Sequence, residues 1–307
     1  MSELGRRNWL APCPYDGALS HPFPLDIVIV ARQHATPPVR LALAAFVLVM
    51  FSACRGDAAG DTPRKAAAKS GAQTTVSGGE VIIAPPKTPY RVATVASPGS
   101  ITGTVSLHGN VTPLPPAETG SDSTVCGRSI PDESVFLLGS GLAGALVWLE
   151  GVDSGKAPSL ERRVELETVH CRLVPRVQAA MIGSAVNIIG HESFRQQLRF
   201  VAAGDSSPRA AILLTGGEQV IPTELPFKAP GLITVRDTEH AWRSAFIGVF
   251  DHPYFAVSTT AGAFTIDSVP PGKYTLHAWH ERTGKVTQSV EVAAGAPTKV
   301  AVTLEGR

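Results

Sequence analysis

The stretch Asp251–Gly284 constrains the fold of this chain most, because strand periodicity is interrupted there twice by turn residues. The candidate strands are Tyr254–Val257, Ala263–Ile266 and Lys273–Trp279, separated by turns at Thr259–Gly262 and Pro270–Gly272. Side chains of a strand point alternately to opposite faces, so Leu276 and Ala278 share one face while His277 and Trp279 share the other. The stretch predicts a compact antiparallel β unit.

The motif P-P-G-x-Y-x-L-x-A-W-H-E, preceded by a G-x-F-x-I turn, resembles the carboxypeptidase regulatory-like domain, a small transthyretin-like module. Thr259 or Thr260 stands at the usual acidic first position of that turn. The resemblance covers Tyr254–Leu304. It implies a β-sandwich of the carbohydrate-binding-like class, which serves as an accessory domain without catalytic residues, at 251–307.

Residues 1–54 have the features of a secretory signal. The one strongly apolar run is Arg40–Cys54 (RLALAAFVLVMFSAC), and its core Leu41–Phe51 is shorter than the roughly 20 residues that a bilayer span needs. Small residues directly before Cys54 resemble the bacterial lipobox. This implies a diacylglycerol-linked Cys54 as mature N-terminus, and a location in the bacterial cell envelope on the periplasmic side or outer surface. An ordinary signal with a coincidental cysteine is the alternative.

Export changes what the remaining cysteines are expected to do. After Cys54 the sequence contains only Cys126 and Cys171. Two cysteines outside a reducing cytosol most simply form a disulfide, and two free buried thiols are the alternative.

The rest of the chain divides into a tether and an all-β region. Residues 55–97 are rich in Ala, Gly, Ser, Thr, Pro and Lys, which predicts a flexible tether. Residues 98–250 contain short strand candidates at intervals typical of a β-sandwich. These are Gly99–Leu107, Gly144–Leu149, Arg163–Thr168, Ala185–Ile189, Leu198–Ala203, Ala210–Thr215, Gly217–Ile221, Leu232–Arg236 and Phe246–Phe250. We therefore expect two all-β sandwiches, 98–250 and 251–307.

Four segments of 98–250 resemble exported cupredoxin-like proteins, relatives of plastocyanin and azurin that are often fused to the regulatory-like module. The segments are Val125–Gly127, Leu142–Glu150 (LAGALVWLE), Cys171–Arg176 and Gly231–Arg243 (GLITVRDTEHAWR). The resemblance implies a Greek-key β-sandwich.

The resemblance also implies where copper ligands would lie. The family supplies one upstream His and a C-x-x-H-x-x-M loop, and type 1 copper needs two imidazoles, a thiolate and a weak thioether. Here the loop falls on Asp237, His240 and Arg243, and the upstream position falls near Gln196, with His191 as the alternative. We expect a relict site that binds no copper, with Asp237 paired to Arg243. Alternatively, both are solvated loop residues.

Other function classes receive less support. The formal charge of +1 argues against nucleic acid, and the chain has neither a G-x-S-x-G nor an H-E-x-x-H motif, so we do not expect an enzyme. A surface metal site could join His240, His252, His280 and Glu281. Exposed Tyr254 and Trp279 could bind a glycan.

The sequence thus predicts a lipid-anchored, non-catalytic envelope protein without a cofactor, with a binding or scaffolding role. Its partners would be the membrane, through the anchor, and an envelope protein or a glycan. The alternatives are a periplasmic electron-transfer or metal-binding cupredoxin with an atypical site, and a carbohydrate-binding accessory protein.

Anchoring predicts that Cys54→Ala abolishes incorporation of labelled palmitate in the producing bacterium, because the modified thiol is lost. Cys13→Ala, upstream of the apolar run, should retain the label. Labelling of the Cys54→Ala protein would contradict the lipoprotein hypothesis.

Overall fold

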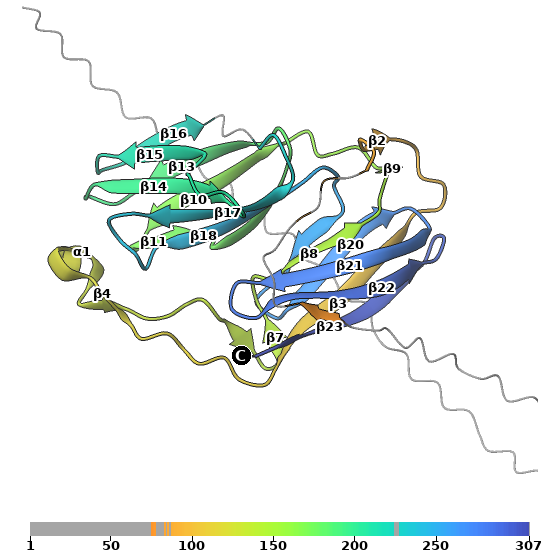
Figure 1. The fold of residues 1–307 in the computed structure, drawn as a ribbon, viewed down its shortest axis with the longest axis horizontal. Helices are drawn as coiled ribbons and strands as arrows, with labels where there is room; N and C mark the ends of the chain where they lie inside the picture. The colour runs from red at the N-terminus through yellow and green to blue at the C-terminus, as the bar shows by residue number, and fades with distance from the viewer. Residues whose placement is uncertain (1–74, 78–82, 84, 86, 224–226, 307) are drawn as a thin grey trace, which may run out of the picture. The chain divides into compact units, whose positions relative to one another are not determined.

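The computed structural model describes residues 75–77, 83, 85, 87–223 and 227–306. All of them belong to one contact-connected unit of the chain, Ala67–Arg307. Their regular structure is almost entirely β-strand, arranged as two β-sandwiches (Figure 1), which confirms the all-β prediction. The predicted signal segment and Cys54 lie outside the described residues. Within the described part, no helix has the length and apolar character needed to cross a bilayer.

One sandwich, here called the inserted sandwich, is built from residues 163–250. Its sheets have the strand orders β11-β10-β13-β16 and β12-β18-β17-β14-β15. The strands are β10 (Arg163–Val169), β11 (Arg172–Val174), β12 (Val177–Met181), β13 (Ala185–Gly190), β14 (Gln196–Ala202), β15 (Ala210–Leu214), β16 (Gln219–Thr223), β17 (Gly231–Asp237) and β18 (Ser244–Phe250). Alternate residues such as Leu198, Phe200 and Val235 fill the core between the sheets.

The second sandwich, here called the split sandwich, takes strands from both sides of the inserted one. Its sheets have the orders β1-β22-β21-β8-β19 and β20-β3-β7-β6, with β23 also paired to β3. The strands are β1 (Thr75–Ser77), β3 (Gly99–His108), β6 (Leu137–Leu138), β7 (Gly141–Leu142), β8 (Leu146–Glu150), β19 (Phe255–Val257), β20 (Ala263–Val269), β21 (Gly272–His280), β22 (Gly284–Val292) and β23 (Pro297–Glu305).

The expected division into 98–250 and 251–307 is therefore wrong. Strand β3 pairs antiparallel with β20 and parallel with β23, and β8 pairs with β21 and β19. Ile101 and Val105 of β3 are fully buried in a core shared with Phe264 and Val302. Local alternation predicts that β3 and β8 are strands, but it carries no information about which distant strands they pair with. The inserted sandwich is therefore an insertion within the split sandwich.

The three strands of 251–284 exist, but they do not pair with one another. Strand β19 belongs to the sheet of β21, whereas β20 belongs to the opposite sheet. The turn between β19 and β20 therefore passes from one sheet to the other. Gly262 in this turn has φ +76°, and a Cβ there would lie 2.3 Å from the carbonyl oxygen of Val105. Only glycine fits this crossing. The predicted faces of β21 are confirmed, since Leu276 and Ala278 lie in the core and Trp279 faces the other way.

The predicted tether 55–97 joins the fold before its expected end. Strand β1 pairs antiparallel with the edge of β22, and β2 (Arg91–Val92) pairs in parallel with β9 (Ser154–Gly155). Ile83 is buried among residues of both sandwiches. Parts of a segment whose composition predicts disorder are thus held by the open edge of β22 and by the apolar cluster around Ile83.

Residues 109–136, between β3 and β6, form a long connection here called the excursion. It contains β4 (Ala117–Glu118), η1 (Gly120–Asp122), α1 (Ser123–Cys126) and β5 (Ser129–Ile130). Cys126 forms the expected disulfide with Cys171 of the inserted sandwich, with a Cα–Cα distance of 5.7 Å. The excursion runs from the split sandwich to the inserted one (Figure 1), and this disulfide links the two covalently.

An aromatic seam joins the outer face of β8 and β21 to that of β18. The ring centroids of Trp148 and Phe250 lie 5.7 Å apart, and those of Phe246 and Trp279 lie 5.3 Å apart. Leu146 and Leu232 complete this buried cluster. Such aromatic contacts fix the two sandwiches against each other through an apolar surface.

Candidate functional site

The four positions predicted for the relict metal site come together at one end of the inserted sandwich. Gln196 begins β14, Asp237 ends β17, and His240 and Arg243 lie in the loop that leads to β18. Their residue exposures are 0%, 3%, 5% and 1%, so none of them is a solvated loop residue. The hairpin of β17 and β18 and the pairing of β14 with β17 place all four.

The Arg243 guanidinium lies at the centre of this group. Nη1 donates to Gln196 Oε1 at 2.5 Å and to Asp237 Oδ2 at 3.3 Å, and Nη2 donates to Glu192 Oε1 at 3.3 Å. The ring of Phe194 lies 5.3 Å from the guanidinium carbon. Burial lowers the pKa of Arg243, while the carboxylates of Asp237 and Glu192 act in the opposite direction. An arginine remains protonated at neutral pH, so these carboxylates balance a buried positive charge.

The His240 ring is held between two carboxylates. Nδ1 lies 2.7 Å from Asp237 Oδ2, and Nε2 lies 2.9 Å from Asp122 Oδ2. A carboxylate only accepts hydrogen bonds, so both contacts are hydrogen bonds when the imidazole carries both protons. Phe194 and Trp242 flank the ring at centroid distances of 4.8 and 5.3 Å. The ring therefore has no nitrogen free for a metal.

These residues do not fit type 1 copper. They offer one imidazole with both nitrogens engaged, no thiolate, and a buried cation in the middle. The alternative upstream ligand, His191, lies outside the group, where it contacts Glu167 and Glu218. The arrangement is a charge cluster, composed of Asp122, Glu192, Gln196, Asp237, His240 and Arg243.

Two members of the charge cluster were missed by the sequence analysis. Asp122 comes from the excursion, four residues before Cys126, so the predicted disulfide was the one signal that could have placed it. Glu192 accepts from the backbone N–H of Cys171 at 2.5 Å, and the Trp242 indole donates to the carbonyl of Cys171 at 3.1 Å. A member of the charge cluster, Glu192, is thus bonded directly to the backbone of a disulfide cysteine.

The other predicted constellations do not assemble. His252 bonds to the Leu149 carbonyl oxygen, while Glu281 pairs with Arg176, so neither joins His240. Burial, followed by the charges of Arg176 and Arg282, lowers the pKa of His280 to about 4. In the described residues, no group of three or more His, Cys, Asp or Glu side chains is placed to hold a metal ion.

The two aromatics proposed for glycan binding are buried. Tyr254 is 0% and Trp279 is 5% exposed, because the former lies in the split-sandwich core and the latter in the aromatic seam. Strand alternation alone could not reveal this, since both faces of β21 are covered at Trp279. Neither ring can stack on a ligand.

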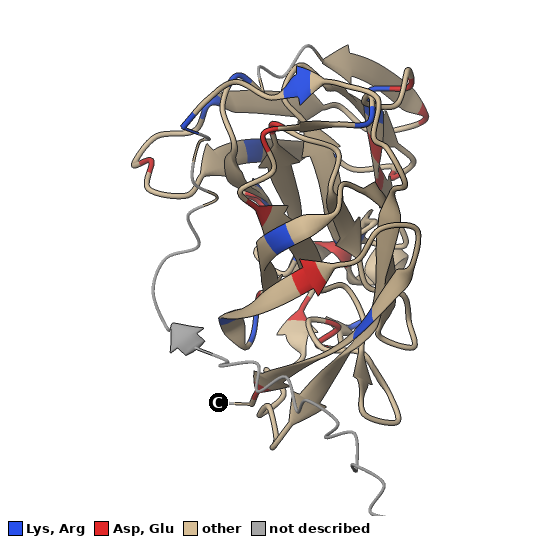
Figure 2. Ribbon diagram, turned by 90° about the vertical axis from the view of Figure 1, so that its right-hand side faces the viewer, with Lys and Arg blue, Asp and Glu red and all other residues tan. Residues whose placement is uncertain are grey.

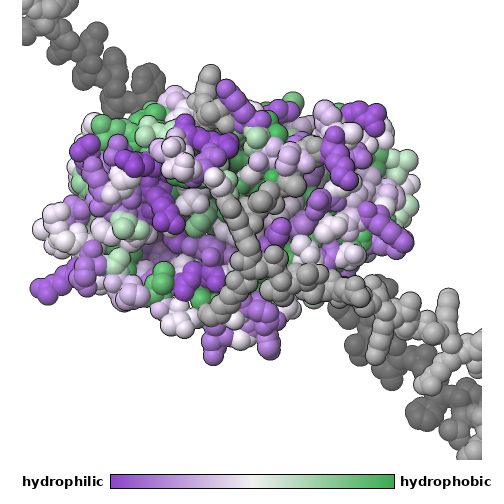
Figure 3. Space-filling model, viewed as in Figure 1, coloured by the Kyte–Doolittle hydropathy of each residue, from purple (hydrophilic) through white to green (hydrophobic). Residues whose placement is uncertain are grey.

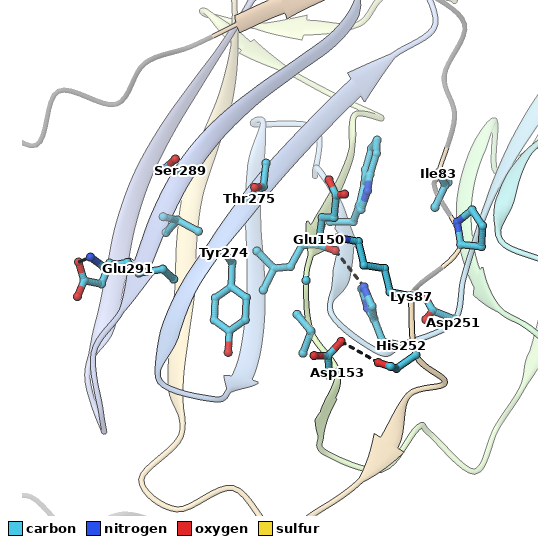
Figure 4. Close-up of a pocket in the computed structure, with 18 residues that line it drawn as sticks. Ile83, Lys87, Glu150, Asp153, Asp251, His252, Tyr274, Thr275, Ser289 and Glu291 are labelled. Carbon is cyan, nitrogen blue, oxygen red and sulfur yellow. Dashed lines mark hydrogen bonds and ion pairs between the residues drawn. The ribbon is translucent and has the colours of Figure 1, made fainter.

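A groove of about 1070 Å³ lies on the split sandwich (Figure 4). One wall is a row across three paired strands, formed by Glu150, Thr275 and Ser289. Asp251 and Lys87 lie on the other side of the groove in this view. Hydroxyls and charged groups of both signs lie among apolar side chains in this groove, here called the polar groove, and its volume is close to that of ligand sites.

Comparison with known proteins gives partial matches. Residues 229–300 match the family model described as polysaccharide lyase family 4, domain II. Curated proteins give no significant match. The chain is similar to solved structures of a copper-containing nitrite reductase from Thermus scotoductus (15% identity, TM-score 0.24), a purple cupredoxin from Nitrosopumilus maritimus (11%, 0.23) and an auracyanin from Roseiflexus castenholzii (13%, 0.24).

These structural matches cover 33%, 28% and 30% of this chain. They cover 99% of the purple cupredoxin and of the auracyanin, but only 25% of the nitrite reductase. The chain thus spans about a quarter of the reductase's length.

The charge cluster predicts that Asp237→Ala lowers the free energy of unfolding by about 2 to 4 kcal/mol, because it leaves a buried guanidinium undercompensated. Adding Arg243→Met should recover part of that loss. Urea unfolding of the single and double variants would measure the coupling.

The matched control is Asp205→Ala, which removes the partner of Arg209 from a half-exposed pair with an Nε–Oδ2 distance of 2.7 Å. It should cost under about 1 kcal/mol. Additive effects of Asp237→Ala and Arg243→Met would contradict the ion pair.

Proposed function

We propose that this chain is a lipid-anchored, non-catalytic protein of the bacterial cell envelope with a binding or scaffolding role. The apolar run and Cys54 support the anchor and the location. One observation carries the non-metal role: Arg243, itself one of the four expected copper-ligand positions and 1% exposed, places its guanidinium against two of the others, Gln196 and Asp237. A buried cation opposes a metal ion electrostatically, and the side chains that could bind one satisfy it instead.

The proposal is also supported by the hydrogen bonds within the charge cluster, where Gln196 Nε2 and Arg243 Nε are the buried polar atoms without a partner among the described residues. His240 contacts two carboxylates, and Arg243 contacts two carboxylates and an amide oxygen. Groups that act in acid–base catalysis must reach a substrate. Here the titratable groups bind one another, which favours a structural use of the cluster that stiffens this end of the inserted sandwich.

Copper titration tests this function. The wild-type protein should retain no stoichiometric Cu(II) after gel filtration. The triple variant Gln196→His, Asp237→Cys, Arg243→Met should take up about one equivalent and gain an intense visible thiolate-to-copper absorption, because it restores the ligand types. Circular dichroism would verify that the variant is folded. Stoichiometric copper in the wild type, or none in the folded triple variant, would contradict the proposal.

Glycan binding is a second candidate, favoured by the polar groove. Its strands β21 and β22 fall within the residues that match the polysaccharide lyase domain model. Four carboxylates line the groove against two lysines, Lys87 and Lys273. The carboxylates are those of Glu150, Asp153, Asp251 and Glu291. This excess of negative charge favours a neutral glycan over an acidic one.

Affinity electrophoresis in gels containing a soluble neutral β-glucan tests glycan binding. The wild-type protein should be retarded, and Thr275→Val should weaken the retardation about threefold or more, because one hydroxyl in the groove is lost. Thr287→Val, on the neighbouring strand and outside the groove lining, is the matched control. Equal effects of the two variants would argue against this candidate. So would retardation of the wild-type protein only in gels that contain the acidic glycan polygalacturonate instead of the neutral β-glucan.

A further inference from the structure

A second pocket, of about 380 Å³, lies where three parts of the fold meet. The excursion contributes Leu114 and Glu133, the inserted sandwich contributes Arg236 and Trp242, and the split sandwich contributes Glu281. Ligand pockets occur preferentially at such boundaries. We call it the junction pocket; it lies beside the charge cluster, with Arg243 on its border.

The junction pocket has an apolar wall that is open to solvent. Leu114 is 52% and Val174 is 41% exposed, and the half-buried Trp242, whose ring also packs against His240, lines the pocket with them. On the face shown in Figure 3, hydrophobic residues are scattered among hydrophilic ones, so single exposed apolar residues are ordinary for this protein. Here, however, they line a concave surface together.

Two of the pocket's arginines are neutralised within the protein. Arg176 makes a bidentate pair with Glu281, with Nη2–Oε2 at 2.8 Å, and Arg172 pairs with Glu133 of the excursion. Both pairs join different parts of the fold. They therefore build the pocket walls.

Arg236 differs from these two arginines. Among the residues that the structure describes, it forms no ion pair within 4.0 Å and no hydrogen bond through its side chain. Its direct cross-strand neighbour on β14 is Arg199, which is also exposed and equally without a carboxylate partner in the described part. Like charges directly opposite each other on a sheet are destabilising. Basic and acidic residues are otherwise interspersed (Figure 2), so this pair is a local excess of positive charge.

We propose that the junction pocket binds a small organic anion: an apolar body against Leu114, Val174 and Trp242, with its oxyanion on Arg236. A guanidinium matches a carboxylate in geometry and charge. An inorganic ion has no apolar surface to pack against the apolar wall, so the wall favours an organic anion. The volume suits a molecule of a few rings rather than a polymer. The proposal goes beyond the function proposed above and concerns a different cavity from the polar groove.

Isothermal titration of the full chain with 2-naphthoate tests the proposal. Saturable binding of one molecule per chain is expected. Arg236→Gln should weaken it about tenfold or more, because a charge-assisted hydrogen bond is lost. Arg199→Gln is the matched control, since it removes the same charge from the adjacent strand but not from the pocket lining; it should change affinity by less than about threefold. Leu114→Asn should also weaken binding, which tests the apolar wall.

Three further results would overturn the proposal. Equal weakening by Arg236→Gln and Arg199→Gln would mean a diffuse electrostatic effect. Equal affinity for the neutral 2-naphthamide would mean that Arg236 plays no part, and displacement of 2-naphthoate by stoichiometric inorganic phosphate would mean a plain anion site. These outcomes are independent of copper titration, so the two proposals fail separately.

Discussion

The backbone pairing of β3 and β8 with strands that follow residue 250 is the constraint on which the rest of this structure depends. It obliges the chain to leave the split sandwich after β8, build a complete second sandwich, and return beside its point of departure. The return places β18 against β8 and β21, which creates the aromatic seam of Trp148, Phe250 and Trp279. The excursion, which starts from β3, lies close enough to the inserted sandwich to be joined to it by a disulfide.

The charge cluster illustrates what this arrangement makes possible. Its centre, Arg243, belongs to the inserted sandwich, but Asp122 reaches His240 from a connection of the split sandwich. A desolvated guanidinium requires carboxylates and amide oxygens around it, because a buried charge without partners is strongly destabilising. Neither sandwich supplies all the partners alone. The complete cluster therefore forms only when the excursion is packed against the inserted sandwich.

The sequence predicted the strands well and the strand partners poorly. Alternation in Lys273–Trp279 is a local property, so the faces of β21 followed from it, whereas the site of Gln196, Asp237, His240 and Arg243 was expected from the family resemblance. The pairing of β3 with β20 and β23 depends on contacts across most of the chain, and nothing within residues 99–108 records it. The prediction that Tyr254 and Trp279 are exposed was wrong for the same reason, because the residues that bury them are distant in the sequence. Asp122 became part of the site only through the excursion.

The pairing of β23 with β3 also has a consequence for the order in which this chain can mature. The two strands pair over nine residues, from Pro297 with Ser100 to Glu305 with His108, and the Ser106 hydroxyl bonds to Val302 across 196 residues. During synthesis or translocation from the N-terminus, β3 emerges long before its last partner. The strand pairs of the inserted sandwich are all internal to 163–250, so this sandwich can close while β3 still has an open edge. The pairing thus permits the inserted sandwich to form before the split sandwich, which is complete only once β23 pairs with β3.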